Sequence, residues 1–281
     1  MKTLTIDIGG TYLRSELHSG SEIFSQTIRS DAQGLLSFIE EQMAAHPDIG
    51  FIGISYAGQV YEGEILSAPN ISIDEHRLKA VVESRYDVTL AIDNDLNCAI
   101  MAEAQHWGTE TLCALYVGTG IGSAVIDGGR LIRGSGNLSF EIGHIPYRHA
   151  PFVCGCGRSN CIELFASGSG IAKWCTRLKI DEDPFLERLK HSSDTNAQMI
   201  VKEFETALLS AAGTLVTLGN PALLVLGGGI IRENPYLLKL LRERLGEFAL
   251  RPSLQNLRIE ISVLDNASMD GAKLLQERRY G

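Results

Sequence analysis

The sequence is poor in cysteine, and it carries less positive than negative charge. Only six cysteines occur among 281 residues, and no two of them form the C-x-x-C pair of a redox centre. Lys and Arg number 25 against 34 Asp and Glu, and the net charge of −9 argues against a nucleic acid held by broad phosphate neutralisation. This charge is still compatible with a small anion held by backbone amides, which add no formal charge.

The sequence also lacks an uninterrupted signal or membrane-spanning segment. Asp7 interrupts the first apolar run before it reaches the length of a signal-peptide core. The uncharged residues 206–231 are numerous enough to cross a bilayer, but GNP at 219–221 divides them and GGG at 227–229 closes them. We therefore expect a buried helix followed by a buried strand, in a cytoplasmic protein whose thiols stay reduced.

Segments of helical character alternate with segments of strand character. Apolar spacing predicts helices over 31–45, 97–105, 201–218 and 269–279, and short apolar runs predict strands over 51–57, 89–93 and 222–229. Such alternation is typical of α/β domains in which helices cover both faces of a sheet. The chain, with 44% hydrophobic residues, is long enough for two such domains.

One strand–turn–strand unit occurs twice. The segment LTIDIGGTYLRSELHSGS, from Leu4, aligns without a gap with CALYVGTGIGSAVIDGGR, from Cys113, at an offset of 109 residues. A repeat of this size predicts two duplicated domains. We place a smaller amino-terminal domain at 1–112 and a larger carboxy-terminal domain at 113–267, and we expect the helix within 268–281 to pack back on the first domain.

Each copy of the unit contains a glycine-rich turn that is suited to phosphate. Backbone N–H groups exposed in such a turn form a nest for phosphate oxygens, and glycine allows their close approach. An isolated GG turn is more often a simple tight hairpin, but two aligned copies favour binding of a nucleotide. The residues concerned are Gly9, Gly10 and Thr11 in the first turn and Gly118, Thr119 and Gly120 in the second.

Asp95 is the candidate catalytic carboxylate. It stands in DNDLN, where a predicted strand gives way to a helix, which is the usual position of ligand groups in open α/β sheets. At such a position it can act as a general base that takes the proton of an attacking hydroxyl. An equally good interpretation of the spacing is that Asp93 and Asp95 only cap the helix that follows.

A third glycine turn ends the apolar strand predicted at 222–229. Because Gly227 and Gly228 have no side chains, a flat group such as adenine can lie against their backbone. Taken alone, however, this turn is better explained as an ordinary connection from a strand to a helix.

Three of the six cysteines lie within eight residues and follow a histidine. The set, with the spacing H-x9-C-x-C-x4-C, is His144, Cys154, Cys156 and Cys161. Three thiolates and an imidazole suit tetrahedral Zn²⁺, whereas a disulfide within C-x-C would be strained. We therefore predict a structural zinc in the loop 144–161, with His149 as an alternative fourth ligand. The remaining cysteines are expected in the core: Cys98, Cys113 and Cys175.

Two acids frame the metal loop. Glu141 precedes His144 by three residues, and Glu163 follows Cys161 by two. A metal-tethered loop would fix both carboxylates, and His144 can bind metal through one ring nitrogen and a ligand through the other. Taken alone, Glu163 can be explained as a simple surface charge. This explanation fits less well for Glu141 and Glu163 together, because the two frame one loop.

In combination these motifs resemble the ROK family of sugar kinases and repressors, within the actin–hexokinase superfamily. The resemblance spans nearly the whole chain and involves IDIGGT (6–11), DNDLN (93–97), VGTGIG (117–122) and NPALLVLGGG (220–229). These are similar to the family's first phosphate loop, catalytic-base motif, second phosphate loop and adenosine segment. E-x-x-H continued by H-x9-C-x-C-x4-C-x-E is similar to its sugar and zinc signature. The family's fold is α/β, with two duplicated actin/hexokinase-like (ribonuclease H-like) domains around a nucleotide–sugar cleft.

The resemblance implies a role for each matching residue. Asp95 would deprotonate a hexose hydroxyl, usually the one on C6, and Asp7 would help to organise Mg²⁺ through water. Other sugar hydroxyls would be held by Asn70, Asn94, Glu141, His144 and Glu163. ATP would be bound by Asp7, Gly9, Gly10, Thr11, Gly118, Thr119, Gly120, Gly227 and Gly228.

Two segments depart from the family pattern. GISYAGQV (53–60) has Tyr56 and Ala57 before Gly58 where a proline is usual, and Phe140 stands before Glu141 where a small residue is usual. The first of these segments lines the family's sugar site. The sugar specificity of any one family member therefore cannot be carried over.

The resemblance implies an ATP- and Mg²⁺-dependent kinase that makes a hexose 6-phosphate, carries structural Zn²⁺ and forms a homodimer. Glucose is the substrate we expect first, while N-acetylmannosamine, N-acetylglucosamine and fructose stay open. Family repressors carry a DNA-binding helix-turn-helix before the first phosphate loop, which here begins at Ile6, so we expect no nucleic-acid or membrane partner. A non-catalytic sugar sensor is a further alternative, which Asp95 and the two glycine loops disfavour.

Overall fold

The computed structural model describes residues 2–277, which form two compact units. Of these residues, 2–108, 129–139 and 264–277 belong to the first unit, and Thr109–Gly128 and Phe140–Val263 to the second. Each unit has an apolar core of its own. The predicted final segment extends over 278–281, which lie outside the described residues. The predicted domain boundary at residue 112 stays a prediction.

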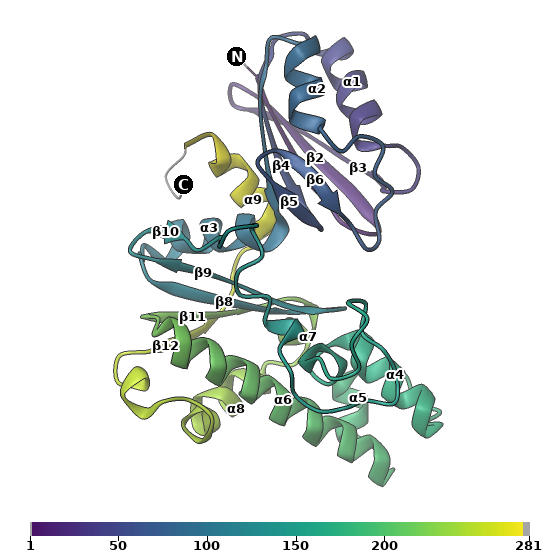
Figure 1. The fold of residues 1–281 in the computed structure, drawn as a ribbon, viewed down its shortest axis with the longest axis vertical. Helices are drawn as coiled ribbons and strands as arrows, with labels where there is room; N and C mark the ends of the chain where they lie inside the picture. Colours follow the sequence, from purple (N-terminus) through teal and green to yellow (C-terminus); the bar gives the residue numbers. More distant parts are fainter. Residues whose placement is uncertain (1, 278–281) are drawn as a thin grey trace. The chain divides into compact units, whose positions relative to one another are not determined.

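The first unit is built on a five-stranded mixed sheet with the strand order β3-β2-β1-β4-β7 (Figure 1). β1, β2 and β3 are antiparallel neighbours, whereas β1, β4 and β7 run parallel. A separate hairpin, β5-β6, follows β4. The strands are β1 (Lys2–Ile8), β2 (Tyr12–Ser19), β3 (Glu22–Arg29), β4 (Ile49–Tyr56), β5 (Gln59–Tyr61), β6 (Glu64–Ser67) and β7 (Thr89–Asn94).

Helices cover both faces of this sheet. Phe38 of α1 shares a core with Ile54 of β4 on one face, while Gly53 of β4 meets α9 on the other. This agrees with the alternation of side chains along a strand. The helices of the unit are α1 (Leu35–Ala45), α2 (Leu78–Arg85), α3 (Asp95–Trp107) and α9 (Ala267–Leu274), and a short 3-10 turn, η5 (Leu275–Glu277), follows α9.

α9 approaches α3 and the sheet closely because two glycines remove side chains at the contacts. A Cβ at Gly271 would lie 1.7 Å from the carbonyl oxygen of Cys98 in α3. A Cβ at Gly53 would lie 2.2 Å from the carbonyl oxygen of Ala272 in α9. Backbone therefore packs on backbone at both contacts, which glycine alone permits. The carboxy-terminal segment is in this way joined to the helix that begins with Asp95.

The second sheet has the strand order β10-β9-β8-β11-β12. β8 is antiparallel to β9 and parallel to β11, which in turn is parallel to β12. Its strands are β8 (Leu112–Val117), β9 (Ile121–Asp127), β10 (Arg130–Leu131), β11 (Leu223–Gly227) and β12 (Arg258–Ile261).

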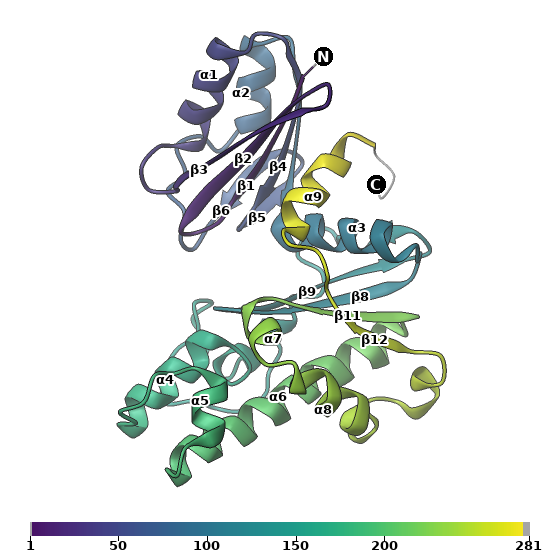
Figure 2. The ribbon, with the colours of Figure 1, turned by 180° about the vertical axis from the view of Figure 1, so that it is seen from behind.

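The long helix α6 organises the core of the second unit (Figure 2). Its residues Phe204, Leu208 and Leu215 are buried in the same cluster as Leu115 of β8. The helices are α4 (Gly168–Leu178), α5 (Leu186–His191), α6 (Thr195–Gly219), α7 (Gly229–Glu233) and α8 (Tyr236–Arg244). Short 3-10 turns are η1 (Ile142–His144), η2 (Ile162–Leu164), η3 (Leu245–Glu247) and η4 (Arg251–Leu254).

The uncharged stretch 206–231 is divided among α6, β11 and α7, as the glycines within it predicted. Within residues 2–277, no helix combines the length and the apolar character that crossing a membrane requires. The predicted buried helix followed by a buried strand is confirmed.

The two sheets share one topology, which confirms the predicted duplication. β1 ends at Ile8 and β8 at Val117, 109 residues later, as the repeat predicted. Beyond this point the ungapped alignment is wrong, because Ile8 pairs with Leu13 whereas Val117 pairs with Ile121. The first turn spans residues 9–12 and the second only 118–120, so the offset falls to 108 in the following strand. Loop length sets the register of a hairpin. The matching residues on either side of the two turns did not reveal that the turns differ in length.

The predicted elements are present, with ends that differ from those expected. The helices predicted from residues 31, 97 and 201 begin at Leu35, Asp95 and Thr195. The start of α6 was missed because its first turn is polar, although the side chain of Asp194 caps it through the N–H of Asn196 at 2.7 Å. The elements α2, α4, α5, α8, β12 and the β5-β6 hairpin were not predicted. Apart from α4, which with 11 residues is as long as α1, each is too short for a clear apolar period.

Gly271→Ala is expected to destabilise the first unit, because the added Cβ would overlap the carbonyl of Cys98 and push α9 away from α3. Overpacking of this kind costs about 1–3 kcal/mol. The midpoint of urea unfolding measures the loss. Gly136→Ala is the matched control, since a Cβ there would meet nothing within 4 Å. Equal midpoints for the two variants would show that α9 is not held by this contact.

Candidate functional site

Three of the predicted motifs begin at the carboxyl ends of neighbouring parallel strands in the first unit. Ile8, Tyr56 and Asn94, the last residues of β1, β4 and β7, lie opposite one another across the sheet. The residues that follow them are the first glycine turn, the loop after β4, and Asp95. The carboxyl ends of parallel strands are where open α/β sheets bind ligands. The sheet therefore brings these three motifs to one edge.

The carboxylate of Asp7 is anchored beside the first glycine turn. Its Oδ1 accepts hydrogen bonds from the hydroxyls of Ser55 at 2.8 Å and Ser268 at 2.9 Å. Its Oδ2 accepts one from the side-chain amide of Asn266 at 3.4 Å and lies 3.8 Å from the guanidinium of Arg14. An acid held in this way fits a water-mediated contact with Mg²⁺, which keeps several waters when it binds proteins.

The first glycine turn touches the predicted sugar contact Asn70. The N–H of Gly9 donates to the carbonyl of Tyr12 at 3.0 Å and closes the turn. A Cβ at Gly10 would lie 2.7 Å from the Cβ of Asn70, so glycine is required for this approach. A predicted phosphate-binding residue and a predicted sugar-binding residue are therefore neighbours in one unit.

Asn94, not an aspartate, is the N-cap of α3. Its Oδ1 accepts a hydrogen bond from the N–H of Leu96 at 2.9 Å, and its Nδ2 donates to the carbonyl of Gly58 at 3.1 Å. Asp95 is the first helical residue, is partly buried, and accepts from the same Leu96 N–H at 3.0 Å. The interpretation of Asp93 and Asp95 as the cap is therefore wrong. Capping of α3 therefore does not explain why an aspartate stands at position 95.

Asp93 instead belongs to a buried hydrogen-bond network. Its side chain is 5% exposed, and its Oδ1 accepts hydrogen bonds from the N–H of Asn94 at 2.8 Å and the Nδ2 atoms of Asn97 and Asn137 at 2.9 Å each. Its Oδ2 pairs with the guanidinium of Arg133. The strand end that precedes Asp95 is thus fixed by partners from another segment.

Tyr56, which with Ala57 precedes Gly58 in the segment that departs from the family pattern, is a core residue. It is 1% exposed, and burial raises the pKa of its phenol to about 12. A Cβ at Gly58 would lie 2.7 Å from the Cε1 atom of the ring, so the ring packs against the backbone of the loop. The departure from the family pattern therefore supplies apolar packing beneath this loop.

The second and third glycine turns are neighbours in the second unit. Gly227, the last residue of β11, pairs with Tyr116 of β8. Gly228 has φ of 90°, and a Cβ there would lie 2.3 Å from the carbonyl oxygen of Val117. A residue with a side chain is excluded at this position on both grounds. The third turn is thus tied by packing to the second.

The amino end of α4 binds the second glycine turn. The N–H of Gly168 donates to the carbonyl of Gly118 at 2.8 Å, and the N–H of Ser169 donates to that of Thr119 at 3.0 Å. Ser167 caps the helix. We did not predict this element, although Ser167 in the segment SGSG (167–170) is of the residue type preferred at an N-cap.

A cavity of about 430 Å³ lies among these elements. The glycine backbone and the positive end of the α4 dipole favour negative charge there, although the first N–H groups of α4 already bond to the protein itself. Ile230 and Phe185 offer apolar surface to a flat base. The predicted residues Gly118 and Thr119 line it. Gly229, which directly follows the predicted residues Gly227 and Gly228, also lines it. The other lining residues are Gly168, Ser169, Ile171, Ala172, Pro184, Leu186, Glu233 and Asn234.

The four predicted metal ligands come together in the second unit. Donor atoms of His144, Cys154, Cys156 and Cys161 all lie within 4.8 Å of one another. The Sγ atoms of Cys156 and Cys161 are 3.3 Å apart, and the Sγ of Cys154 lies 3.6 Å from Nδ1 of His144. Tetrahedral Zn–S bonds of about 2.3 Å place sulfurs about 3.8 Å apart, so donor set and spacing fit Zn²⁺. Binding through Nδ1 would leave Nε2 of His144 for a ligand.

The surroundings of the thiols differ within this cluster. Hydrogen bonding by the backbone N–H of Arg158 lowers the pKa of Cys156 to about 6, whereas burial raises the pKa of Cys154 to about 12. A thiol with a lowered pKa reduces the cost of forming the first thiolate ligand. His149, the alternative ligand, lies at the surface with its Nδ1 3.3 Å from the hydroxyl of Ser159. His149 is therefore outside the cluster.

Glu163 joins the metal loop to the second glycine turn. Its Oε1 lies 3.4 Å from the Sγ of Cys154, and its Oε2 accepts a hydrogen bond from the N–H of Ile121 at 3.4 Å. A Cβ at Gly143, next to His144, would lie 2.3 Å from the carbonyl oxygen of Ile121. Metal loop and turn are therefore packed together through two contacts.

Glu141 follows a residue with unusual backbone geometry. Phe140 has φ of 58°, in the left-handed region that aromatic residues rarely adopt, and its carbonyl accepts the hydroxyl of Ser123 at 2.6 Å. Removal of water by neighbouring protein raises the pKa of Glu141, although the residue retains exposed surface; His144 opposes this shift and Glu163 adds to it. The left-handed backbone at Phe140, the aromatic departure from the family pattern, thus turns the chain directly before Glu141.

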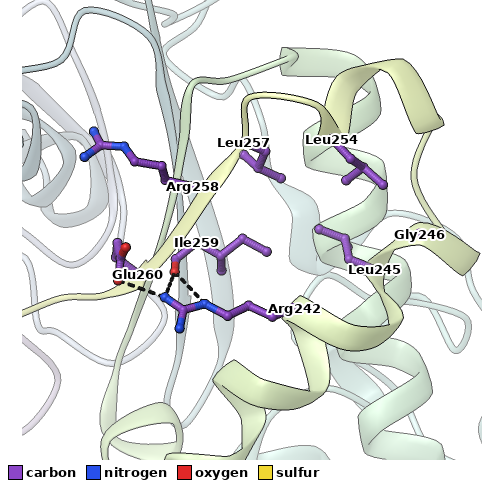
Figure 3. A pocket seen from close by; sticks show the side chains of 8 residues that line it. All are labelled: Arg242, Leu245, Gly246, Leu254, Leu257, Arg258, Ile259 and Glu260. Atoms are coloured by element: carbon purple, nitrogen blue, oxygen red, sulfur yellow. Dashed lines mark hydrogen bonds and ion pairs between the residues drawn. The ribbon is translucent and has the colours of Figure 1, made fainter.

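A second cavity, of about 320 Å³, lies beside the edge strand β12 (Figure 3). Leucines from η3, η4 and the segment before β12 form one side of it. The guanidinium of Arg242 donates to the carbonyl of Ile259 at 2.6 Å and 3.2 Å and to Glu260 at 3.0 Å. Because these donors serve the protein itself, this cavity offers less to an anionic ligand than the one at α4.

The motifs, the duplicated sheets and the Cys3His cluster together point to one family. A model of the ROK family matches residues 3–279. The chain belongs to the ROK family. The resemblance predicted from the motifs is confirmed, as is the predicted two-domain α/β fold.

Relatives within the ROK family include both enzymes and regulators. A glucokinase from Halalkalibacterium halodurans is 27% identical, covering 93% of this chain and 90% of that protein. A xylose repressor from Caldicellulosiruptor bescii is 26% identical, covering 94% of this chain and 75% of that protein. The solved structure of a ROK hexokinase from Thermus thermophilus has a TM-score of 0.81 at 24% identity, covering 100% of both chains, and supports the fold. The chain is thus a sugar kinase or regulator of this family.

Several residues of the site were not predicted. Ser55 and Ser268 hold Asp7, and Asn137 and Arg133 hold Asp93. Of these, only the stretch around Ser268 carries a local signal, since Asn266 before it caps α9. The other contacts join segments far apart in the chain and leave no periodic trace in the sequence.

Removal of one thiol tests the metal site. Purified protein is expected to contain about one equivalent of zinc, and Cys156→Ser is expected to lose most of it, because a closed site needs all four ligands. Elemental analysis by mass spectrometry measures the content. Cys175→Ser, at a buried position in α4, is the control and should keep its zinc. Equal zinc in both variants would exclude Cys156 as a ligand.

Proposed function

We propose that this ROK protein is an ATP- and Mg²⁺-dependent sugar kinase that phosphorylates the 6-hydroxyl of a hexose, with glucose as the first substrate to test. The observation that carries the proposal is the alignment of Ile8, Tyr56 and Asn94 in the first sheet. It brings a phosphate-type glycine turn, the loop after β4 and the acid Asp95 to one edge. Phosphoryl transfer needs these three functions: phosphate binding, sugar binding and proton removal.

Asp95 is the proposed general base. Its carboxylate stands in the first turn of α3, where the helix dipole favours negative charge. The hydroxyl on C6 of the sugar would donate its proton to Asp95 as its oxygen attacks the γ-phosphorus. Base catalysis of this kind contributes about 10²–10⁴-fold, and alignment of the reactants contributes much of the rest.

The proposed contacts to the other sugar hydroxyls are Asn70, Asn94, Glu141, His144 and Glu163. Carboxylates, amides and imidazole can all accept hydrogen bonds from hydroxyls. Amides and imidazole can also donate hydrogen bonds to them. The Nδ2 of Asn94 already donates to Gly58, so its remaining N–H is the donor available to a sugar.

The proposed metal ions have separate roles, one structural and one electrostatic. Zinc, bound by the Cys3His cluster, would fix the loop that carries Glu141, His144 and Glu163, and magnesium would neutralise charge on the phosphates. The second glycine turn, with Gly118 and Thr119, would bind the phosphates of ATP in the 430 Å³ cavity, beside the positive end of the α4 dipole. The adenine would lie against Gly229 and Ile230.

A coupled assay of ADP release over a panel of sugars tests the proposal. Glucose, N-acetylmannosamine, N-acetylglucosamine and fructose are each offered with ATP and Mg²⁺, and glucose is expected to give the highest kcat/KM. If none of these sugars supports ADP release, the kinase proposal fails. Sugar binding without ADP release would instead favour a non-catalytic sensor, the class to which the kinship with a repressor also points.

Asp95→Asn is expected to lower kcat about 10²–10⁴-fold, because the amide keeps the size of the side chain but cannot take a proton. Sugar affinity, measured by calorimetry, should change little. Asp31→Asn, at an exposed position, is the control for loss of one negative charge. Turnover by Asp95→Asn at the wild-type rate would remove Asp95 as the base.

Ala172→Trp tests the nucleotide cavity. Ala172 lines the cavity from α4, and an indole there would fill the space proposed for ATP. We expect binding of a fluorescent ATP analogue to weaken at least about tenfold, which corresponds to 1.4 kcal/mol, while sugar binding is retained. Arg177→Trp, farther along α4 and exposed, is the matched control. Unchanged nucleotide affinity in Ala172→Trp would place the nucleotide elsewhere.

A further inference from the structure

Asn137 stands in a compact loop of the first unit that no motif had marked. The loop spans residues 133–139 and is closed by a hydrogen bond from the N–H of Ser139 to the carbonyl of Arg133 at 3.2 Å. Asn137 has φ of 57°, a left-handed conformation that asparagine tolerates better than most residues. Its backbone thereby turns the side chain toward β7 and α3, where its hydrogen-bond partners lie.

The side-chain amide of Asn137 uses its full hydrogen-bonding capacity. Its Nδ2 donates to the carbonyl of Val60 at 2.8 Å and to Oδ1 of Asp93 at 2.9 Å. Its Oδ1 accepts from Nδ2 of Asn97 at 3.0 Å and from the guanidinium of Arg133 at 3.2 Å. Two donors and two acceptor sites are all that an amide offers. The reverse orientation would set its oxygen against a carboxylate and a carbonyl, so the network fixes the amide.

Three of these four bonds connect the loop to other segments of the first unit, and the fourth, from Arg133, lies within the loop. Val60 belongs to β5, directly after the loop that follows β4. Asp93 is the last residue but one of β7, and Asn97 lies in the first turn of α3, on either side of Asp95. The side chain of Asp93 is 5% exposed, and loss of a partner from so buried a carboxylate is costly. Asn137 is the member of the network that reaches all three segments.

We propose that Asn137 is a positioning residue that fixes the first turn of α3, and with it the carboxylate of Asp95, relative to the loop after β4. Its part in catalysis rests on the proposed kinase function, whereas its effect on the α3 turn does not. Asn137 acts through Asp93 and Asn97, and a misplacement of about 1 Å at a reacting group can cost about 10²-fold in rate. Neither the sugar nor the nucleotide needs to touch it.

Asn137→Gly isolates the contribution of the amide. Glycine adopts φ of 57° more readily than asparagine, so the backbone of the loop stays unstrained while four hydrogen bonds are lost. Asn137→Asp is the second variant, since it keeps the shape but replaces the donor to Asp93 with an acceptor. Asn220→Gly is the matched control: Asn220, the C-cap of α6, has φ of 41°, and its N–H bonds to the carbonyl of Val216.

Hydrogen exchange of the intact protein, followed by NMR, tests the structural step. The N–H groups of Asn94 and Leu96 are bonded to side chains of this turn, at 2.8 Å to Asp93 and 2.9 Å to Asn94. Both should exchange at least about tenfold faster in Asn137→Gly and Asn137→Asp. In Asn220→Gly they should exchange as in the wild type. Unchanged exchange in both Asn137 variants would overturn the inference.

Steady-state kinetics tests the catalytic step. In both Asn137 variants kcat should fall about 10–100-fold while KM for the sugar stays within about threefold, because proton removal depends on placement of Asp95. Faster exchange with an unchanged kcat, or a rise in KM alone, would overturn the positioning role. If the wild type releases no ADP with any sugar, the proposed function fails, and hydrogen exchange alone decides whether Asn137 fixes the α3 turn.

Discussion

The parallel pairing of β1, β4 and β7 is the constraint on which the rest of the first unit depends. Register across a sheet is set by a ladder of backbone hydrogen bonds, and here it makes Ile8, Tyr56 and Asn94 end their strands together. Each strand therefore places a different motif at the same edge, where Asn94 at the end of β7 bonds to Gly58 of the loop after β4. The pairing of β8 with β11 does the same for two glycine turns in the second unit.

Much of the fold and many of the site motifs could be predicted from the sequence because their signals are local. A glycine turn, a Cys3His spacing or an acid after an apolar strand is contained within a few neighbouring residues. The register of the repeat could not, because shortening the turn from residues 9–12 to 118–120 leaves the surrounding pattern of glycines intact. Nor could the network of Asn137, whose partners Val60 and Asp93 precede it by 77 and 44 residues.

Glycine has two separate uses in this protein, and the sequence alone does not distinguish them. Gly228 combines a left-handed backbone with an approach to Val117 that excludes any side chain, and it belongs to the turn that adjoins the 430 Å³ cavity. Gly271 lets α9 pack against the backbone of α3 at Cys98 and is itself part of no predicted motif. From the sequence alone, Gly228 would be interpreted as functional and Gly271 as a residue that destabilises its helix. Close packing requires glycine at both positions.

Glu163 has neighbours on two sides, the thiol of Cys154 and the N–H of Ile121. A single carboxylate thus belongs at once to the metal loop and to the glycine turn. Any exchange at this position made to alter sugar preference would act on metal retention and on turn geometry in the same step. Directed evolution of the preference would therefore advance more readily at positions that belong to neither part, such as the proposed sugar contact Asn70.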